Sequence, residues 1–344
     1  MKFVHIADIH FDSPFVNLSD KETLGEIKRL EQRKVFKKVI DYIKENKIEF
    51  LFIAGDLYEH KYIRKSTIEY INKLFQEIPD TEIFISPGNH DPFTKNSYYN
   101  KFRWNDNVHI FNAKIEKIEM ENVNIYGYGF NDFYCTDCGI NKIELDEKNK
   151  ENILVIHSTI DGANSDEKQY NSISKKILEE KGFDYVATGH IHKLDYNTTE
   201  NQNIVYPGSL ISLGFDELGQ HGMIVGNIEN KKLSTQFIPL SENDFTEKKI
   251  DQLENRNNEL IKIILIGKRK FEINKNEIYK LITNEKIIKI KDCTQIEYEL
   301  EKIANQNTLK GLFTKEILKE KENCDDEQLK ILEKAIEIVY EALE

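Results

Sequence analysis

The chain has 344 residues, of which 39% are hydrophobic and 10% aromatic, a composition that supports a buried core and excludes an intrinsically disordered protein. Its formal net charge of −12 argues against a protein that coats DNA through bulk electrostatics, because binding to the phosphate backbone normally requires a basic surface. The length favours one large domain followed by a smaller one.

The apolar runs are strand-sized, which excludes a membrane-spanning helix, and Asp8 and His10 interrupt the stretch that a signal peptide would need. The chain has four cysteines, too few for a disulfide framework in a protein of this length. The CxxC formed by Cys135 and Cys138 is a weak sign of metal or redox chemistry. We therefore expect a reduced, cytoplasmic protein.

Six short apolar runs end in Gly, Pro or polar residues and predict buried strands that lead into functional loops. In chain order they are FVHIADIH, EFLFIAGD, EIFISPGNH, NILVIHS, FDYVATGHIH and NIVYPGS. A long amphipathic helix is expected over residues 19–47, where Ser19 and Glu22 fit a capping box, and a second helix is expected to begin near Ser66. Strands that alternate with helices indicate an α/β architecture.

The character of the chain changes after about Leu240, where a polar linker precedes new strand and helix patterns. We expect strand material around residues 260–267, a helix over 276–283, a strand over 286–291, and helices to the end. The predicted organisation is a large domain over residues 1–240, a small α/β domain over 245–306 and a helical tail over 307–344.

The helical tail carries an apolar face at near-helical spacing, with charged residues between its members. This face consists of Leu329, Leu332, Ile336, Val339, Tyr340 and Leu343. It can pack on the small domain or dock a partner, and the sequence leaves both alternatives open.

Five motifs rich in metal-ligand residue types follow the apolar runs. They are Asp8-Ile9-His10, Gly55-Asp56, Gly88-Asn89-His90-Asp91, His157 and Gly189-His190-Ile191-His192. Each motif alone has an ordinary explanation, such as a turn, a capping carboxylate or a buried histidine. Because α/β sheets place ligand sites at the carboxyl ends of strands, all five together favour one shared metal site. Oxygen and imidazole ligands without thiolates suit Mn²⁺, Fe or Zn²⁺.

The ordered set D-x-H, GD, GNHD, H and GH-x-H resembles the calcineurin-like metallophosphoesterase superfamily. The strings HIADIHFDSPF, GDLYEH and VYPGSLISLGFDELGQHG look like the bacterial YhaO/SbcD-type DNA exonucleases, relatives of the double-strand-break repair nuclease that works with an SMC-like ATPase. The resemblance covers about residues 1–240 by motif and 245–344 by layout alone. It implies a two-sheet α/β sandwich flanked by helices, with the small C-terminal domain as a cap over the site.

The resemblance also implies two divalent metal ions, Mn²⁺ before Fe or Zn²⁺, that share one bridging carboxylate. One ion would be held by Asp8, His10, Asp56 and His192, and the other by Asp56, Asn89, His157 and His190. Two such ions can clamp a phosphate and activate a water, and their charge outweighs that of the aspartates, so an acidic protein can still attract a phosphodiester.

The remaining polar residues of these loops are open to more than one interpretation. The resemblance makes His90 the residue that stabilises or protonates the leaving oxygen, with Asp91 holding its ring, although Asp91 could equally cap a helix. Asp12 could orient a ligand or form a loop salt bridge. The family often has a histidine three residues after the GD aspartate, where this chain has Glu59, so the role of that histidine is not carried over. Structural or surface positions are expected for His5, His60, His109 and His221.

The resemblance favours an Mn²⁺-dependent phosphoesterase that cleaves DNA as an exonuclease or endonuclease in DNA repair, with an SMC-like ATPase subunit as a partner and a homodimer allowed. A phosphomonoesterase or cyclic-nucleotide phosphodiesterase on the same scaffold is the alternative, since the same metal ions serve all three reactions. A non-catalytic interaction module predicts loss of ligand residues, and none of the seven positions is lost.

Overall fold

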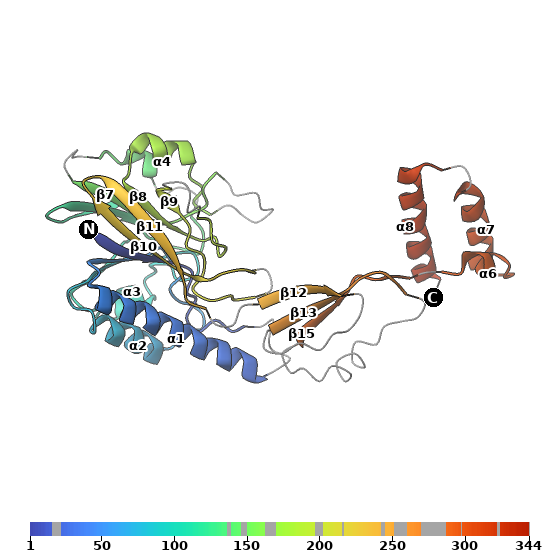
Figure 1. Ribbon diagram of the computed structural model, residues 1–344, viewed down its shortest axis with the longest axis horizontal. Coiled ribbons are helices and arrows are strands. Elements are labelled where there is room, and N and C mark those ends of the chain that lie inside the picture. Colours follow the sequence, from blue (N-terminus) through green and yellow to red (C-terminus); the bar gives the residue numbers. More distant parts are fainter. Residues whose placement is uncertain are drawn as a thin grey trace. The chain divides into compact units, whose positions relative to one another are not determined.

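Figure 1 shows the computed structural model of the chain, which describes residues 1–15, 22–135, 139–145, 150–161, 170–196, 202–214, 217–241, 245–250, 260–269, 287–296, 298–321 and 324–343. The contacts divide the chain into two compact units. The first contains the described residues from Met1 to Glu247 and from 260 to 262, and the second contains those from 248 to 250 and from Ile263 onward. The predicted boundaries of the cap and tail within the C-terminal part stay predictions.

The first unit contains a six-stranded mixed sheet in the order β11-β10-β1-β2-β3-β4. Its strands are β1 (Lys2–Ile6), β2 (Phe50–Ile53), β3 (Glu82–Ile85), β4 (Val108–Ile110), β10 (Gly222–Glu229) and β11 (Lys232–Pro239). The strands β1 to β4 run parallel, whereas β10 is antiparallel to both β1 and β11. The carboxyl ends of β1, β2 and β3 therefore lie at the same edge of this sheet.

A second sheet of five strands has the order β5-β6-β7-β8-β9. Its strands are β5 (Glu116–Glu119), β6 (Val123–Tyr128), β7 (Glu151–His157), β8 (Tyr185–Gly189) and β9 (Ile204–Val205). The strands β6 to β9 are parallel and β5 is antiparallel to β6. All six apolar runs of the sequence form strands, namely β1, β2, β3, β7, β8 and β9.

The two sheets face each other across one hydrophobic core. Phe3 and Phe52 from the first sheet pack there with Val155 and Tyr185 from the second, and the ring centroids of Phe3 and Tyr185 are 4.5 Å apart. This packing brings the carboxyl ends of β7 and β8 beside those of β1 and β2.

Helices cover the outer faces of this sandwich. Figure 1 shows α1 (Glu22–Asn46), α2 (Lys65–Phe75) and the short α3 (Tyr98–Lys101) on the side of the first sheet, and α4 (Lys175–Lys181) on the side of the second. The α1 helix buries Val35, Phe36, Val39, Ile40 and Ile43, which follow the helical period. The predicted two-sheet α/β sandwich flanked by helices is confirmed. Ser19, the predicted capping residue, lies outside the described residues.

The chain after residue 244 forms small sheets and helices. β12 (Phe245–Ile250), β13 (Leu260–Leu265) and β15 (Ile287–Asp292) form a three-stranded sheet, and β14 (Lys268–Arg269) pairs with β16 (Gln295–Ile296). α6 (Leu300–Ala304), α7 (Leu309–Lys321) and α8 (Asp326–Ala342) follow. The helix predicted over residues 276–283 falls outside the described part of the chain. Among the helices that are described, none is long and apolar enough to cross a membrane.

The tail helix α8 uses part of its predicted apolar face for packing. Ile336 and Tyr340 are buried in a cluster with Ile317 of α7, and the hydroxyl groups of Tyr340 and Thr314 are hydrogen-bonded. By contrast, Leu343 is exposed. Part of this face is therefore core, which favours the packing alternative for these residues.

Candidate metal centre

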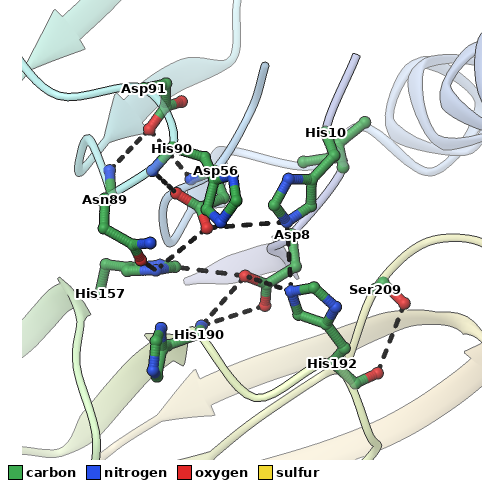
Figure 2. Close-up of polar contacts among 12 residues, drawn as sticks. Asp8, His10, Asp56, Asn89, His90, Asp91, His157, His190, His192 and Ser209 are labelled. Carbon is green, nitrogen blue, oxygen red and sulfur yellow. Dashed lines mark hydrogen bonds and ion pairs between the residues drawn. The ribbon is translucent and has the colours of Figure 1, made fainter. Parts of the chain in front are cut away.

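The seven predicted ligand residues come together where strands of both sheets end. Asp8 and His10 follow β1, Asp56 follows β2, and Asn89 follows β3, while His157 ends β7. His190 and His192 follow β8. Figure 2 shows these side chains converging on one region, with contributions from both layers of the sandwich. The site can therefore form only after the two sheets have packed.

The backbone is strained at four of these positions. Asp8, His10, Asp56 and His190 have φ angles of 51°, 50°, 52° and 101°, in the left-handed region that non-glycine residues rarely adopt. Each such residue costs about 1–3 kcal/mol and persists only where its surroundings hold it. Backbone hydrogen bonds hold the β1 loop to the β2 loop, from Asp8 N to Gly55 O at 3.1 Å and from His10 N to Asp56 O at 2.9 Å. Strain of this kind concentrates at functional sites.

The glycines that precede Asp56 and Asn89 provide room for the ligands. A Cβ on Gly55 would lie 2.3 Å from Nδ1 of His157, and a Cβ on Gly88 would lie 2.3 Å from Oδ1 of Asp56. Gly55 also has a φ of 90°, which glycine adopts without strain. Any larger residue at either position would displace a ligand.

The first ligand group consists of Asp8, His10, Asp56 and His192, whose ligand atoms all lie within 4.8 Å of one another. Nε2 of His10 is 3.2 Å from Nε2 of His192 and 3.6 Å from Oδ2 of Asp56. Nε2 of His192 is 3.9 Å from Oδ1 of Asp8. These four residues are the set that the resemblance implied for one metal ion.

The second ligand group adjoins the first through Asp56. Nε2 of His157 lies 3.3 Å from Oδ2 of Asp56 and 3.0 Å from Oδ1 of Asn89, and the ring centroids of His157 and His190 are 5.2 Å apart. Oδ2 of Asp56 is thus close to histidines of both groups, 3.6 Å from Nε2 of His10 and 3.3 Å from Nε2 of His157.

Three of the histidines are oriented through the ring nitrogen that faces away from the centre. Nδ1 of His10 contacts Oε1 of Glu59 at 2.8 Å, and Nδ1 of His157 contacts the carbonyl oxygen of Ala54 at 2.9 Å. Nδ1 of His192 contacts Oε1 of Glu217 at 2.5 Å. In each contact Nδ1 donates its proton to an oxygen and Nε2 is directed toward the centre, the orientation typical of histidines that bind a metal. The donor set and its orientation thus fit divalent transition metals.

Glu217 is a site residue that the sequence did not single out. Its Oε2 accepts hydrogen bonds from the backbone N of Leu213 at 2.9 Å and from Oγ of Ser209 at 3.1 Å, so the carboxylate behind His192 is fixed. Ser209, Leu213 and Glu217 all belong to the string VYPGSLISLGFDELGQHG. This string supported the family resemblance, but it did not indicate that Glu217 contacts His192.

Comparison with known proteins agrees with this geometry. Residues 1–194 match the calcineurin-like phosphoesterase family. The chain belongs to this family. It is 25% identical over 247 residues to a Bacillus subtilis protein named uncharacterized metallophosphoesterase YhaO, covering 69% of this chain and 60% of that protein. It is also similar to two proteins named as the SbcD component of the nuclease SbcCD. The one from Staphylococcus saprophyticus is 27% identical over 70% of this chain and 69% of the relative, and the one from Staphylococcus epidermidis is 30% identical over 70% of each.

In this calcineurin-like phosphoesterase, His90 stands beside the ligand groups with Glu59 as its partner. Nδ1 of His90 is 3.1 Å from Oε2 of Glu59, and the ring centroids of His90 and His10 are 4.7 Å apart. Burial opposes the charged form of His90, but the hydrogen bond to Glu59 and the charge of Asp56 outweigh burial and raise the pKa of His90 to about 9. A bound cation would push this pKa back toward neutral, the range that suits a general acid.

The structure corrects the interpretation of Asp91. Its carboxylate does not hold the His90 ring, because it accepts hydrogen bonds from the backbone N of Gly88 at 2.7 Å and of Leu57 at 2.6 Å, and from the hydroxyl of Tyr99 at 2.5 Å. Neither of the two roles weighed for Asp91 is correct. This buried carboxylate instead ties the loop after β3 to the loop after β2. The residue behind the His90 ring is Glu59.

The charges of the centre depend on one another. Burial opposes ionisation of both aspartates and raises the pKa of Asp8. At Asp56 the neighbouring histidines, His157 foremost and then His90 and His10, together outweigh burial and lower the pKa well below its usual value. Burial also opposes a charge on His157 and His192, but the neighbouring carboxylates raise their pKa values to about 9 and about 10. Metal ions can bind here only by displacing those protons.

Three of the four histidines that were expected at structural or surface positions have contacts of that kind. His5 and His221 are buried, and His109 pairs with Glu82 at 2.6 Å beside the ring of Phe84. Asp12 forms the salt bridge that the sequence allowed, with Arg33 at 2.9 Å. Cys135 is buried with its Sγ 3.1 Å from the hydroxyl of Tyr128, and its CxxC partner Cys138 lies outside the described residues.

Proposed function

We propose that this chain is a metal-dependent phosphodiesterase, a DNA exonuclease or endonuclease with a role in DNA repair, that uses two Mn²⁺ ions. The observation that carries the proposal is the pair of adjoining ligand groups that meet at Asp56, with His90 beside them in contact with the carboxylate of Glu59. The relatives named as part of the nuclease SbcCD support DNA as the substrate.

The residues would divide the reaction between them. The metal ions, when bound by Asp8, His10, Asp56 and His192 and by Asp56, Asn89, His157 and His190, would polarise the phosphate and lower the pKa of the attacking water. His90 would donate a proton to the departing oxygen. Glu59 keeps the His90 ring charged and oriented before the reaction. The same carboxylate orients His10, so one residue positions both the proposed proton donor and a metal ligand.

A partner protein fits the same proposal. Two relatives carry the name of one component of a larger nuclease, and the resemblance implies an SMC-like ATPase. On α8, Ile331 and Ile338 are 64% and 57% exposed and lie two helical turns apart on one face, away from the buried Ile336 and Tyr340. We propose this exposed face as part of the ATPase contact. Replacing both isoleucines by aspartate should abolish co-purification with a co-expressed ATPase while leaving hydrolysis of a small substrate intact.

One experiment separates the proposed activity from its alternatives. The purified chain with Mn²⁺ should be tested side by side on linear DNA, a cyclic nucleotide, a chromogenic phosphodiester and a chromogenic phosphomonoester. DNA cleavage that is lost in Asp56→Asn supports the nuclease. Hydrolysis of the monoester or of the cyclic nucleotide with intact DNA would instead assign the chain to the phosphomonoesterases or the cyclic-nucleotide phosphodiesterases.

A further inference from the structure

A chain of aromatic contacts leads from the metal centre to an exposed tyrosine. The ring of the candidate ligand His190 lies 5.4 Å from the ring of Tyr170, in an edge-on arrangement. Tyr170 in turn stacks on Tyr134, with centroids 5.7 Å apart and planes 23° from parallel. The side chain of Tyr134 is 60% exposed.

The loops that carry the two tyrosines are fixed to each other and to the centre. Each tyrosine precedes one member of a hydrogen-bonded pair, since the backbone N of Asn171 donates to the carbonyl oxygen of Cys135 at 2.7 Å. Nδ2 of Asn171 donates to the carbonyl oxygen of His157 at 3.3 Å, and Asn171 itself has a strained φ of 46°. The stack is therefore held in register with a candidate metal ligand.

The neighbouring aromatic residue contacts the opposite loop of the site. Phe133 is 44% exposed, and its ring meets that of His60 edge-on at 5.6 Å. The backbone N of His60 donates to the carbonyl oxygen of His90 at 2.9 Å. The consecutive residues Phe133 and Tyr134 thus connect the loop of the general acid with the ligand His190.

We propose that Tyr134, supported from behind by Tyr170, is a stacking platform for an unpaired nucleobase of the strand whose phosphodiester lies at the metal centre. The proposal rests on the proposed nuclease function and narrows its substrate to a strand end or a single-stranded segment. In a duplex both faces of an interior base are covered by its neighbours, so only an unpaired or terminal base can offer a face to the tyrosine ring.

Stacking on Tyr134 would also add affinity for DNA that the net charge of the protein does not provide. With a net charge of −12 the chain gains little from bulk attraction of phosphates, whereas a base stacked on an aromatic side chain contributes a factor of about 5 to 150 in affinity and tolerates any sequence. The platform therefore increases the affinity for DNA without a basic surface and without base-specific hydrogen bonds.

A double-substitution cycle tests the platform directly. The value of kcat/KM is measured for a single-stranded oligonucleotide with an intact terminal base and for the same oligonucleotide with an abasic terminus, with the wild-type chain and with Tyr134→Ala. We expect the wild-type chain to prefer the intact terminus by a factor of about 5 to 150, and Tyr134→Ala to lose this preference. The conservative variant Tyr134→Phe keeps the ring and should keep the preference.

The possible outcomes distinguish the platform from the nuclease proposal. If the wild-type chain cleaves both oligonucleotides equally well, or if Tyr134→Ala retains the preference, the platform is refuted while the nuclease stands. If the wild-type chain cleaves neither oligonucleotide, the platform is refuted, and cleavage of linear duplex DNA by the same preparation shows whether the nuclease proposal stands. Fluorescence of Trp104, the single tryptophan, and metal content should be unchanged in Tyr134→Ala, which separates loss of stacking from loss of folding.

Discussion

Oε1 of Glu59 lies 2.8 Å from Nδ1 of His10, and this contact sets which nitrogen of the histidine faces the metal centre. The hydrogen bonds from His10 and His90 overcome the effect of burial and lower the pKa of Glu59 to about 2, so the carboxylate stays ionised throughout the working pH range. Glu217 serves His192 in the same way across the centre. The two carboxylates are positioning residues, because they act through the histidines.

Replacement of either carboxylate should weaken metal binding. We expect Glu59→Gln and Glu217→Gln to lower metal affinity about 10- to 100-fold, because the amide no longer fixes the inward-facing nitrogen as a strong acceptor. Titration with Mn²⁺ measures the change. Glu82→Gln is the matched control, since Glu82 holds His109 on the surface, away from the centre. Unchanged affinity in both site variants would contradict the positioning role.

Asp56→Asn should lose metal from both ligand groups, because Oδ2 of Asp56 approaches His10 at 3.6 Å and His157 at 3.3 Å. Elemental analysis of the purified variant provides the measurement. Asp12→Asn is the control, since Asp12 lies in the loop after β1, near the ligand His10, but binds Arg33, so this variant should retain both ions. Full metal content in Asp56→Asn would exclude a bridging role.

His90→Asn should keep both metal ions and lose activity by about 10²- to 10⁴-fold on a diester with a poor leaving group, as expected for a proton donor. The deficit should shrink with a nitrophenolate leaving group, which departs without protonation. Comparison of kcat for the two diesters tests this, with His109→Asn as the surface control. A deficit of equal size on both diesters would argue against proton donation.

His5 should make the first unit sensitive to acid. Burial lowers its pKa from 6.5 to about 3, so the folded chain keeps His5 neutral while the unfolded chain binds a proton. The free energy of unfolding is therefore not affected by His5 above about pH 6.5, and it decreases as the pH falls from about 6.5 toward about 3. At about pH 4.5 the loss from His5 is about 3 kcal/mol.

Denaturant unfolding of the wild-type chain and of His5→Gln at about pH 7.5 and about pH 4.5 measures this contribution. Trp104 lies in the first unit, so its fluorescence follows that unit. The variant should lose less stability between the two pH values than the wild-type chain. Parallel losses in the two proteins would show that His5 does not titrate in this range.

The sequence by itself determined the elements and the ligand types of this protein. The apolar runs that end in Asp8, Asp56 and His157 are local signals, because strand period and loop chemistry are written in neighbouring residues. Strands that end in polar loops meet at one edge of a parallel sheet, so the assembly of the seven ligand-type residues could also be expected.

Only the tertiary structure decided which partner supports each histidine. Glu59 is 49 residues from His10 and 31 from His90, and Glu217 is 25 residues from His192, so these pairs exist only once distant loops pack together. Asp91 illustrates the limit, since its neighbour His90 was the obvious partner in sequence but its carboxylate bonds to backbone N–H groups 34 and 35 residues away. A side chain bonds to whatever donor the fold brings within reach, and that is a property of packing rather than of local sequence.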